Sequence, residues 1–147
     1  SLAGMVNVVA RTLETSLWRL QALGFNPEKV ISAWGKAPIP PISKDEYTSM
    51  IRSNTYVYYG GTVGLTVDCD DKEITDILTK VILSKETTEQ YGIPFGKLLA
   101  DANGNIFEMA KFVHSVTKVI FYNVNSGNTF KCGEIDLEVL KECLGEL

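Results

Sequence analysis

The sequence predicts an α+β fold in a single domain, with a long N-terminal helix, a mostly antiparallel sheet and several shorter helices. Helix-like and strand-like segments follow one another without the strict alternation that is typical of parallel α/β proteins. The chain has 147 residues, which is enough to bury one core and too few for two ordinary domains. We therefore expect residues 1–147 to form one domain.

The composition argues against several classes of protein. The formal net charge is −4 at pH 7 and no cluster of Lys and Arg is present, which argues against a nucleic-acid partner. No apolar run is long enough for a membrane-spanning helix, so we expect no membrane partner. Three cysteines without Cys-x-x-Cys spacing (Cys69, Cys132 and Cys143) are typical of reduced thiols in the cytoplasm. A metal site is not expected, because the single histidine, His114, lies in an apolar segment that favours a structural role.

The N-terminal segment has the strongest helical pattern and organises the rest of the chain. Its apolar residues recur at spacings of three and four: Val6, Val9, Ala10, Leu13, Leu17 and Leu20. The other side carries Asn7, Arg11, Glu14, Trp18 and Gln21. We expect a helix over residues 6–23 that ends at Gly24. A weak, solvated ion pair is the simplest interpretation of Arg11 and Glu14, because residues three apart share one side of a helix.

The next segment predicts a strand and a rigid connector. Asn26-Pro27 is a turn sequence, and the apolar residues 30–34 predict a short strand. Residues 37–41 contain three prolines, which cannot donate backbone hydrogen bonds within a sheet. We expect an extended connector there, either as a spacer between elements or as part of a pocket lining.

A helix is predicted to begin at Ser43, where Ser-x-x-Glu forms a capping box, and to end near Ser53. Arg52 and Asn54 would then stand at a helix-to-strand junction, where side chains are presented to the surroundings. For Arg52, a surface charge near the end of the helix and a ligand-binding group are equally open.

The strongest strand signal lies in residues 56–68, which are rich in Tyr, Val and Thr. Gly60 and Gly61 inside this segment indicate either a bulge or a place where a flat ligand lies against the backbone. Tyr59 could stack on such a ligand or pack in the core.

The remaining elements are predicted from local signals. Acidic residues at 70 and 71 favour a helix start, Asp136 is a helix cap, and a turn sequence at 125–128 predicts a hairpin. The expected helices cover residues 73–80, 94–100 and 137–144, the strands 116–124 and 129–135, the loop 84–90 and the turn 101–104. Residues 106–113 are ambiguous.

Several short motifs occur in order along almost the whole chain: SLAG at 1–4, ARTLET at 10–15, GKAPIPP at 35–41, RSN at 52–54, YYGG at 58–61 and SGNTFKCGEI at 126–135. In this order and spacing they resemble the C-terminal half of the methenyltetrahydromethanopterin cyclohydrolases. This archaeal and methylotroph family opens the methenyl bridge of a folate-like C1 carrier to give the formyl compound. Its members are much longer than this chain, and their substrate lies in a cleft between two halves. The resemblance therefore implies a C-terminal domain, over residues 1–147, whose N-terminal half is absent.

The resemblance also implies the residues of the site. The Arg-x-x-Glu of the family's active site falls on Arg11 and Glu14. Glu14 would act as general base and then as general acid near the cationic methenyl carbon. Arg11 would orient Glu14, favour its ionised form or stabilise the oxyanion of the hydrated intermediate. Substrate binding is implied for Arg52, Asn54, Tyr59, Gly60 and Gly61. Thr55 stands where family members carry an aspartate, which puts one substrate contact in doubt.

As a whole, the resemblance implies hydrolysis of 5,10-methenyltetrahydromethanopterin to 5-formyltetrahydromethanopterin in cytoplasmic one-carbon metabolism or methanogenesis. The tetrahydromethanopterin carrier is the substrate, and no cofactor is needed. The implied partners are the N-terminal half of the enzyme and further copies of the chain, which form a trimer in the family. Two other interpretations stay open: a non-catalytic pterin-binding or oligomerisation module, and a plain α+β domain whose motifs reflect ancestry alone.

Overall fold

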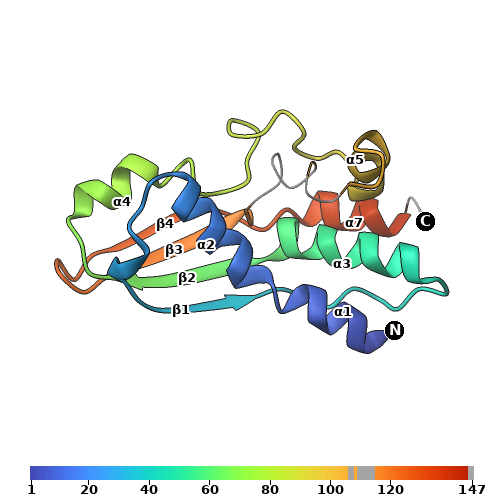
Figure 1. Ribbon diagram of the computed structural model, residues 1–147, viewed down its shortest axis with the longest axis horizontal. Helices are drawn as coiled ribbons and strands as arrows, with labels where there is room; N and C mark the ends of the chain where they lie inside the picture. Colours follow the sequence, from blue (N-terminus) through green and yellow to red (C-terminus); the bar gives the residue numbers. More distant parts are fainter. Residues whose placement is uncertain (106–107, 109–114, 146–147) are drawn as a thin grey trace.

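Four strands form the central sheet, in the order β1 (Val30–Lys36), β2 (Thr62–Val67), β3 (Lys118–Asn123) and β4 (Thr129–Gly133). The computed structural model describes residues 1–105, 108 and 115–145 (Figure 1). β1 and β2 pair antiparallel, as do β3 and β4, whereas β2 and β3 pair in parallel. The predicted α+β class with a mostly antiparallel sheet is therefore confirmed. Parallel neighbours need a crossover connection of a dozen residues or more, and residues 68–117 separate β2 from β3 in the sequence.

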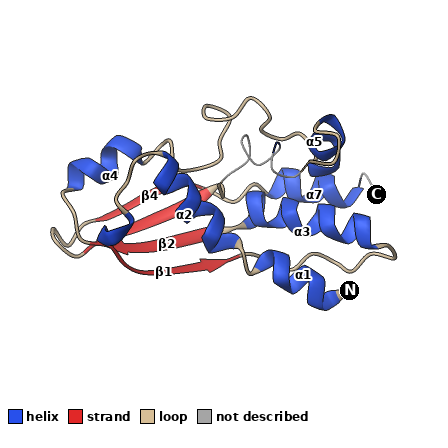
Figure 2. Ribbon diagram, viewed as in Figure 1, coloured by secondary structure: helices blue, strands red, loops and turns tan. Residues whose placement is uncertain are grey.

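Helices lie both beside the sheet and beyond its end. Figure 2 shows the strands at one end of the molecule and α1, α3, α5 and α7 at the other, whereas α2 and α4 accompany the sheet. The bounds of these helices are α1 Leu2–Val9, α2 Thr12–Ala22, α3 Glu46–Gly60, α4 Asp71–Ile77, α5 Phe95–Asp101 and α7 Leu137–Gly145, with a short 3-10 helix η1 at Pro27–Lys29. Within the described residues, no helix is both long enough and apolar enough to cross a membrane.

One face of the sheet forms the core under α2. Side chains alternate along each strand, so every second residue of β2 and β3 points to the same face. On this face Val63, Leu65, Val119 and Phe121 are fully buried. Trp34, at the next register position, points to the opposite face and lies against Gly64. The core therefore sits between the sheet and α2 and continues into the bundle around α3.

The N-terminal segment is helical, as expected, but it is interrupted at Ala10 and Arg11 and does not run continuously over residues 6–23. The backbone N–H of Arg11 donates to the Val8 carbonyl, 3.1 Å away and only three residues back. The Thr12 hydroxyl donates to the Val9 carbonyl at 2.7 Å. A threonine hydroxyl that competes for a helix carbonyl favours a break. The break lets α1 pack against α3 while α2 packs against the sheet.

The predicted boundaries of the third helix and the second strand are wrong. Asp45 caps α3, accepting from the backbone N–H of Thr48 at 2.7 Å, whereas the Ser43 hydroxyl donates to the Asp45 carbonyl. The helix continues to Gly60, so residues 56–60 are helical and the paired glycines form a helix-to-strand junction, not a bulge. Aromatic and β-branched residues favour strands, but residues 56–60 are buried as part of α3, which packs against α1, α5 and α7, and this burial outweighs that preference.

The other local predictions agree with the structure to within a few residues; the helix expected at 73–80, for example, is α4 at Asp71–Ile77. The apolar residues after η1 form β1, and the proline-rich residues 37–41 form an extended connector outside the sheet. The pair β3 and β4 is a hairpin, and Asp136 caps α7 by accepting from the backbone N–H groups of Glu138 and Val139. Cys69, Cys132 and Cys143 all lie within the described residues and form no disulfide. His114 and the ambiguous residues 106 and 107 and 109–113 lie outside the described residues.

Candidate active site

Arg11 and Glu14 lie at the break between α1 and α2, and both are exposed. Arg11 is the N-cap residue of α2, and Glu14 lies in the first turn of that helix. The positive end of a helix dipole stabilises a carboxylate in this position. No hydrogen bond or ion pair in the described part of the chain joins the two side chains, so the expected weak ion pair is not formed. Both charged groups face outward together.

The opposite side of α2 is anchored in the core. Thr12, Ser16 and Leu20 are 2%, 0% and 2% exposed, and all three face the sheet. Arg19 Nε donates to the Lys80 carbonyl at 3.0 Å, which ties the second half of the helix to the segment after α4. A helix that is held along its buried side keeps its outward groups in a defined position, as a catalytic constellation requires.

Two glycines let the beginning of α2 lie close to the sheet. A Cβ atom on Gly35, at the end of β1, would lie 3.0 Å from the backbone nitrogen of Leu13. A Cβ atom on Gly61 would lie 3.1 Å from the Thr12 methyl carbon and 2.3 Å from the Val57 carbonyl oxygen. These two glycines therefore set how far Arg11 and Glu14 stand from the sheet. The role of Gly35 was missed by sequence reasoning, although its place in the GKAPIPP motif was a signal.

The proline-rich connector follows α3 in the reverse direction. A Cβ atom on Gly60 would lie 3.0 Å from the Pro38 ring, and the Pro41 carbonyl accepts from Arg52 Nη1 at 3.4 Å. Arg52 is half-buried, and its buried Nε has no hydrogen-bond partner among the described residues. Asn54 Nδ2 donates to the Met50 carbonyl at 2.9 Å within the same helix. Arg52 and Asn54 thus lie inside α3, not at its end.

Tyr59 is a core residue. It is 2% exposed, its hydroxyl accepts from the backbone N–H of Gly92 at 2.9 Å, and its ring meets Tyr91 edge-on at 5.3 Å. Burial raises the pKa of Tyr59, and it raises the pKa of the neighbouring Tyr58 to about 12. Both phenols therefore stay protonated at neutral pH and do not supply a base.

Of the seven predicted site residues, the structure brings Arg11 and Glu14 together on an open surface. Gly61 lies against Thr12, on the buried side of α2 below the charged pair, and Gly60 is covered by Pro38 and Leu140. Protein side chains thus cover the backbone of both glycines, so these glycines have a packing role. Substrate binding by Arg52, Asn54, Tyr59, Gly60 and Gly61 stays a prediction, and Tyr59 has no open surface that would favour it.

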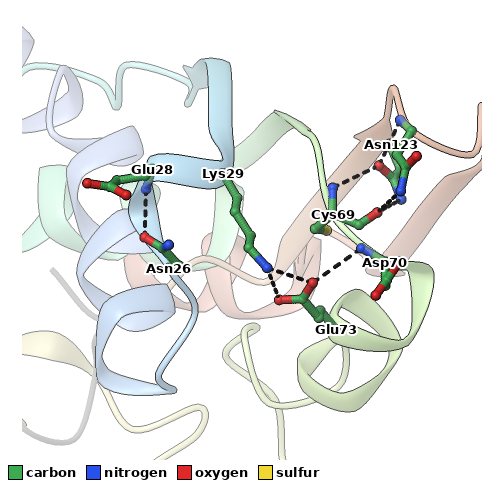
Figure 3. A network of polar contacts seen from close by, with 8 residues as sticks. Asn26, Glu28, Lys29, Cys69, Asp70, Glu73 and Asn123 are labelled. Atoms are coloured by element: carbon green, nitrogen blue, oxygen red, sulfur yellow. Dashed lines mark hydrogen bonds and ion pairs between the residues drawn. The ribbon is translucent and has the colours of Figure 1, made fainter.

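A second polar cluster lies at the far end of the sheet (Figure 3). Lys29 Nζ lies 2.7 Å and 2.6 Å from the two carboxylate oxygens of Glu73, which also accepts from the backbone N–H of Asp70. The hydrogen bond between them raises the pKa of Lys29 and lowers that of Glu73. Beside them, burial raises the pKa of the Cys69 thiol, so this cysteine is not an activated nucleophile. The cluster joins η1 to α4, which is a structural role.

The part of the chain that the structure describes contains no group of side chains suited to binding a metal ion. There, no three side chains of His, Cys, Asp or Glu lie together in a way that could hold a metal ion. The expectation that the reaction needs no cofactor stays a prediction.

Comparison with known proteins identifies the family. The family model described as "Cyclohydrolase (MCH)" matches residues 1–144. The chain is 32% identical over 99% of its length to the methenyltetrahydromethanopterin cyclohydrolase of Rhodopirellula baltica, and 32% identical over 99% to that of Methanocella arvoryzae. It is 33% identical over 96% of its length to the enzyme of the same name from Methylobacterium sp.. The match covers 44%, 44% and 43% of these relatives, so the chain spans less than half of their length. On the family match over almost its whole length, this chain belongs to the cyclohydrolase (MCH) family.

Proposed function

We propose that this chain is part of an enzyme that hydrolyses 5,10-methenyltetrahydromethanopterin to 5-formyltetrahydromethanopterin. The family membership and the names of the relatives support this proposal. Because the chain spans less than half of those relatives, we propose that it works together with a segment that corresponds to the rest of their length, the N-terminal half of the resembled enzymes. Assembly of several copies and a cytoplasmic location, as in the resemblance, belong to the same proposal.

The observation that carries the proposal is that Arg11 and Glu14 are both exposed on the outward side of α2, at the helix break. Neither side chain forms a hydrogen bond or ion pair with another described residue, and the buried residues Thr12, Ser16 and Leu20 anchor the helix instead. A carboxylate and a guanidinium that are held on a rigid helix and left open to one side are suited to a cationic substrate and an anionic intermediate.

The chemistry requires one water and one group that moves protons. The methenyl carbon is a cation held between two ring nitrogens. Glu14 takes a proton from water while the water oxygen bonds to the methenyl carbon. The bond from the carbon to one nitrogen then breaks, this nitrogen receives a proton from Glu14, and the carbon becomes a formyl group on the other nitrogen. The hydroxyl of the water adduct loses its proton to solvent as the C=O bond of the formyl group forms, so one proton is released overall. Arg11 stabilises the developing oxyanion and orients Glu14.

The test uses a complete protein, in which this chain replaces the matching segment of the Rhodopirellula baltica cyclohydrolase. Glu14→Gln is expected to lower the rate of hydrolysis of the methenyl carrier by about 10²- to 10⁴-fold, the usual contribution of a general acid–base. Glu28→Gln changes an exposed carboxylate in η1 and is the matched control, with an unchanged rate. Circular dichroism shows whether each variant is folded. A Glu14→Gln protein that turns over at nearly the parent rate would exclude Glu14 from catalysis.

A further inference from the structure

The outward side of α2 carries a third large side chain besides the charged pair. Trp18 is 57% exposed, although tryptophan is usually among the well-buried residues. At 100° per residue, positions 11, 14 and 18 fall within a sector of roughly 60° on the helix. Thr12, Ser16 and Leu20 point the other way, into the core. Trp18 therefore shares one open surface with Arg11 and Glu14.

The spacing brings the indole next to the carboxylate. Trp18 lies four residues after Glu14, which is about 6 Å along a helix axis. Helical side chains lean toward the N-terminus, so a long side chain covers the turn before its own Cα. The ring of Trp18 therefore lies beside the surface from which Glu14 would act. α1 and α2 contain no other aromatic residue.

Two other aromatic candidates, Tyr59 and Trp34, do not share this surface. Tyr59 is 2% exposed and packs against Tyr91. Trp34 is the only other tryptophan of the chain, and it lies on the face of the sheet that points away from α2. Trp18 is thus the aromatic group that α2 presents on the same side as the proposed catalytic pair.

A cationic, flat substrate suits this arrangement chemically. Tryptophan binds cations over its ring face better than the other aromatic residues do, and it stacks on flat heterocycles. The methenyl carrier has a flat ring system, and its positive charge is spread over the methenyl bridge. We propose that Trp18 is a substrate-binding residue whose indole stacks on the ring of the methenyl carrier while Glu14 acts on the methenyl carbon. This inference rests on the function proposed above.

The proposal predicts an effect on binding more than on the chemical step. A stacking contact is present in both ground and transition state, so its loss raises KM and leaves kcat nearly unchanged. In the complete protein, Trp18→Leu is expected to raise KM by about 5- to 100-fold, the usual range for loss of one stacking partner. Trp18→Phe keeps a ring and should raise KM less. Trp34→Phe, on the opposite face of the sheet, is the matched control with an unchanged KM.

Direct binding gives a second measurement that does not depend on turnover. Equilibrium dialysis of 5,10-methenyltetrahydromethanopterin against the 147-residue chain should show weaker binding for Trp18→Leu than for the parent and for Trp34→Phe. Equal KM and equal binding for Trp18→Leu and the parent would overturn the assignment. If Trp18→Leu instead weakened association with the segment that corresponds to the rest of the relatives' length, while binding of the carrier stayed unchanged, Trp18 would be an interface residue. That result would also overturn the assignment. If the parent neither binds nor hydrolyses the carrier, the proposed function fails and this inference fails with it; if only Trp18→Leu behaves like the parent, the proposed function stands.

Discussion

Gly61 gives the sharpest test of how the fold supports the site. A Cβ atom at this position would lie 2.3 Å from the Val57 carbonyl oxygen, 2.8 Å from Val116 Cγ1 and 3.1 Å from the Thr12 methyl carbon. The Gly61 N–H donates to that same carbonyl at 3.0 Å. Overpacking of a core usually lowers stability by about 1–3 kcal/mol, and loss of a hydrogen bond by about 0.5–1.5 kcal/mol. We therefore expect Gly61→Ala to lower the free energy of unfolding by about 2–4 kcal/mol.

The neighbouring glycine is the matched control. Gly60 is the last residue of α3, where alanine gains about 1 kcal/mol in helix propensity. Its Cβ would lie 3.0 Å from Cδ and Cγ of the Pro38 ring and 3.3 Å from Leu140 Cδ1, which offsets part of that gain. Gly60→Ala should thus change stability by less than about 1 kcal/mol. Urea unfolding of the 147-residue chain, followed by circular dichroism, measures both values. Two alanine variants of equal stability would show that α2 and Val57 yield easily, and would refute the argument from close approach.

Three further predictions concern the supports of the site and of the hairpin. Asp71 accepts hydrogen bonds from three hairpin side chains, chiefly Ser126, and these lower its pKa below the unfolded value of 3.8. The stabilising effect of the ionised Asp71 is therefore complete above pH 3.8 and is lost as the pH falls through its lower folded pKa. Asp71→Ala should consequently make the free energy of unfolding decline less steeply in acid. Tyr91→Phe removes the hydroxyl that donates to Asp136 at 2.5 Å and should lower the free energy of unfolding by about 1 kcal/mol in urea unfolding; an unchanged value would show that this hydrogen bond does not stabilise the fold. Thr12→Val keeps the shape of the side chain but removes the hydroxyl at the helix break; it should lower stability by about 1 kcal/mol and also the rate of hydrolysis in the complete protein, whereas an unchanged rate would mean that the break does not position Glu14.

The parts of the fold that could be predicted from the sequence are those with a local signal. Pro94 precedes α5, Asp136 caps α7, and residues 125–128 form the turn of the hairpin. Each of these features depends only on residues that are close in the sequence. The same local logic failed at residues 56–60. Their aromatic and β-branched character predicts a strand, but they are buried as the last turn of α3. That outcome depends on tertiary contacts that no local pattern contains.

The candidate site was predictable only in part for the same reason. Arg11 and Glu14 share an outward side because helical periodicity requires it, and this much could be derived from their spacing. The break beneath them could not, since it depends on the Thr12 hydroxyl and on two separate surfaces against which α1 and α2 pack. The role of Gly35 exists because Leu13 approaches it from another element, so only its place in the GKAPIPP motif, and no helix or strand pattern, signalled that role.

The buried side of α2 therefore bears on function as much as its outward side does. Arg11 and Glu14 have no hydrogen bond to each other in the described chain, so their relative position is set by the helix and by what lies under it. A misplacement of about 1 Å at a catalytic group can reduce a rate by about 100-fold. Thr12 already lies at close-packing distance from Gly61, and Leu13 from Gly35. A larger side chain at either glycine therefore finds no free space and must move the helix. Substitutions under α2 should consequently lower turnover more than their effect on stability suggests, whereas substitutions of equal thermodynamic effect at the distant Lys29–Glu73 pair should leave turnover unchanged.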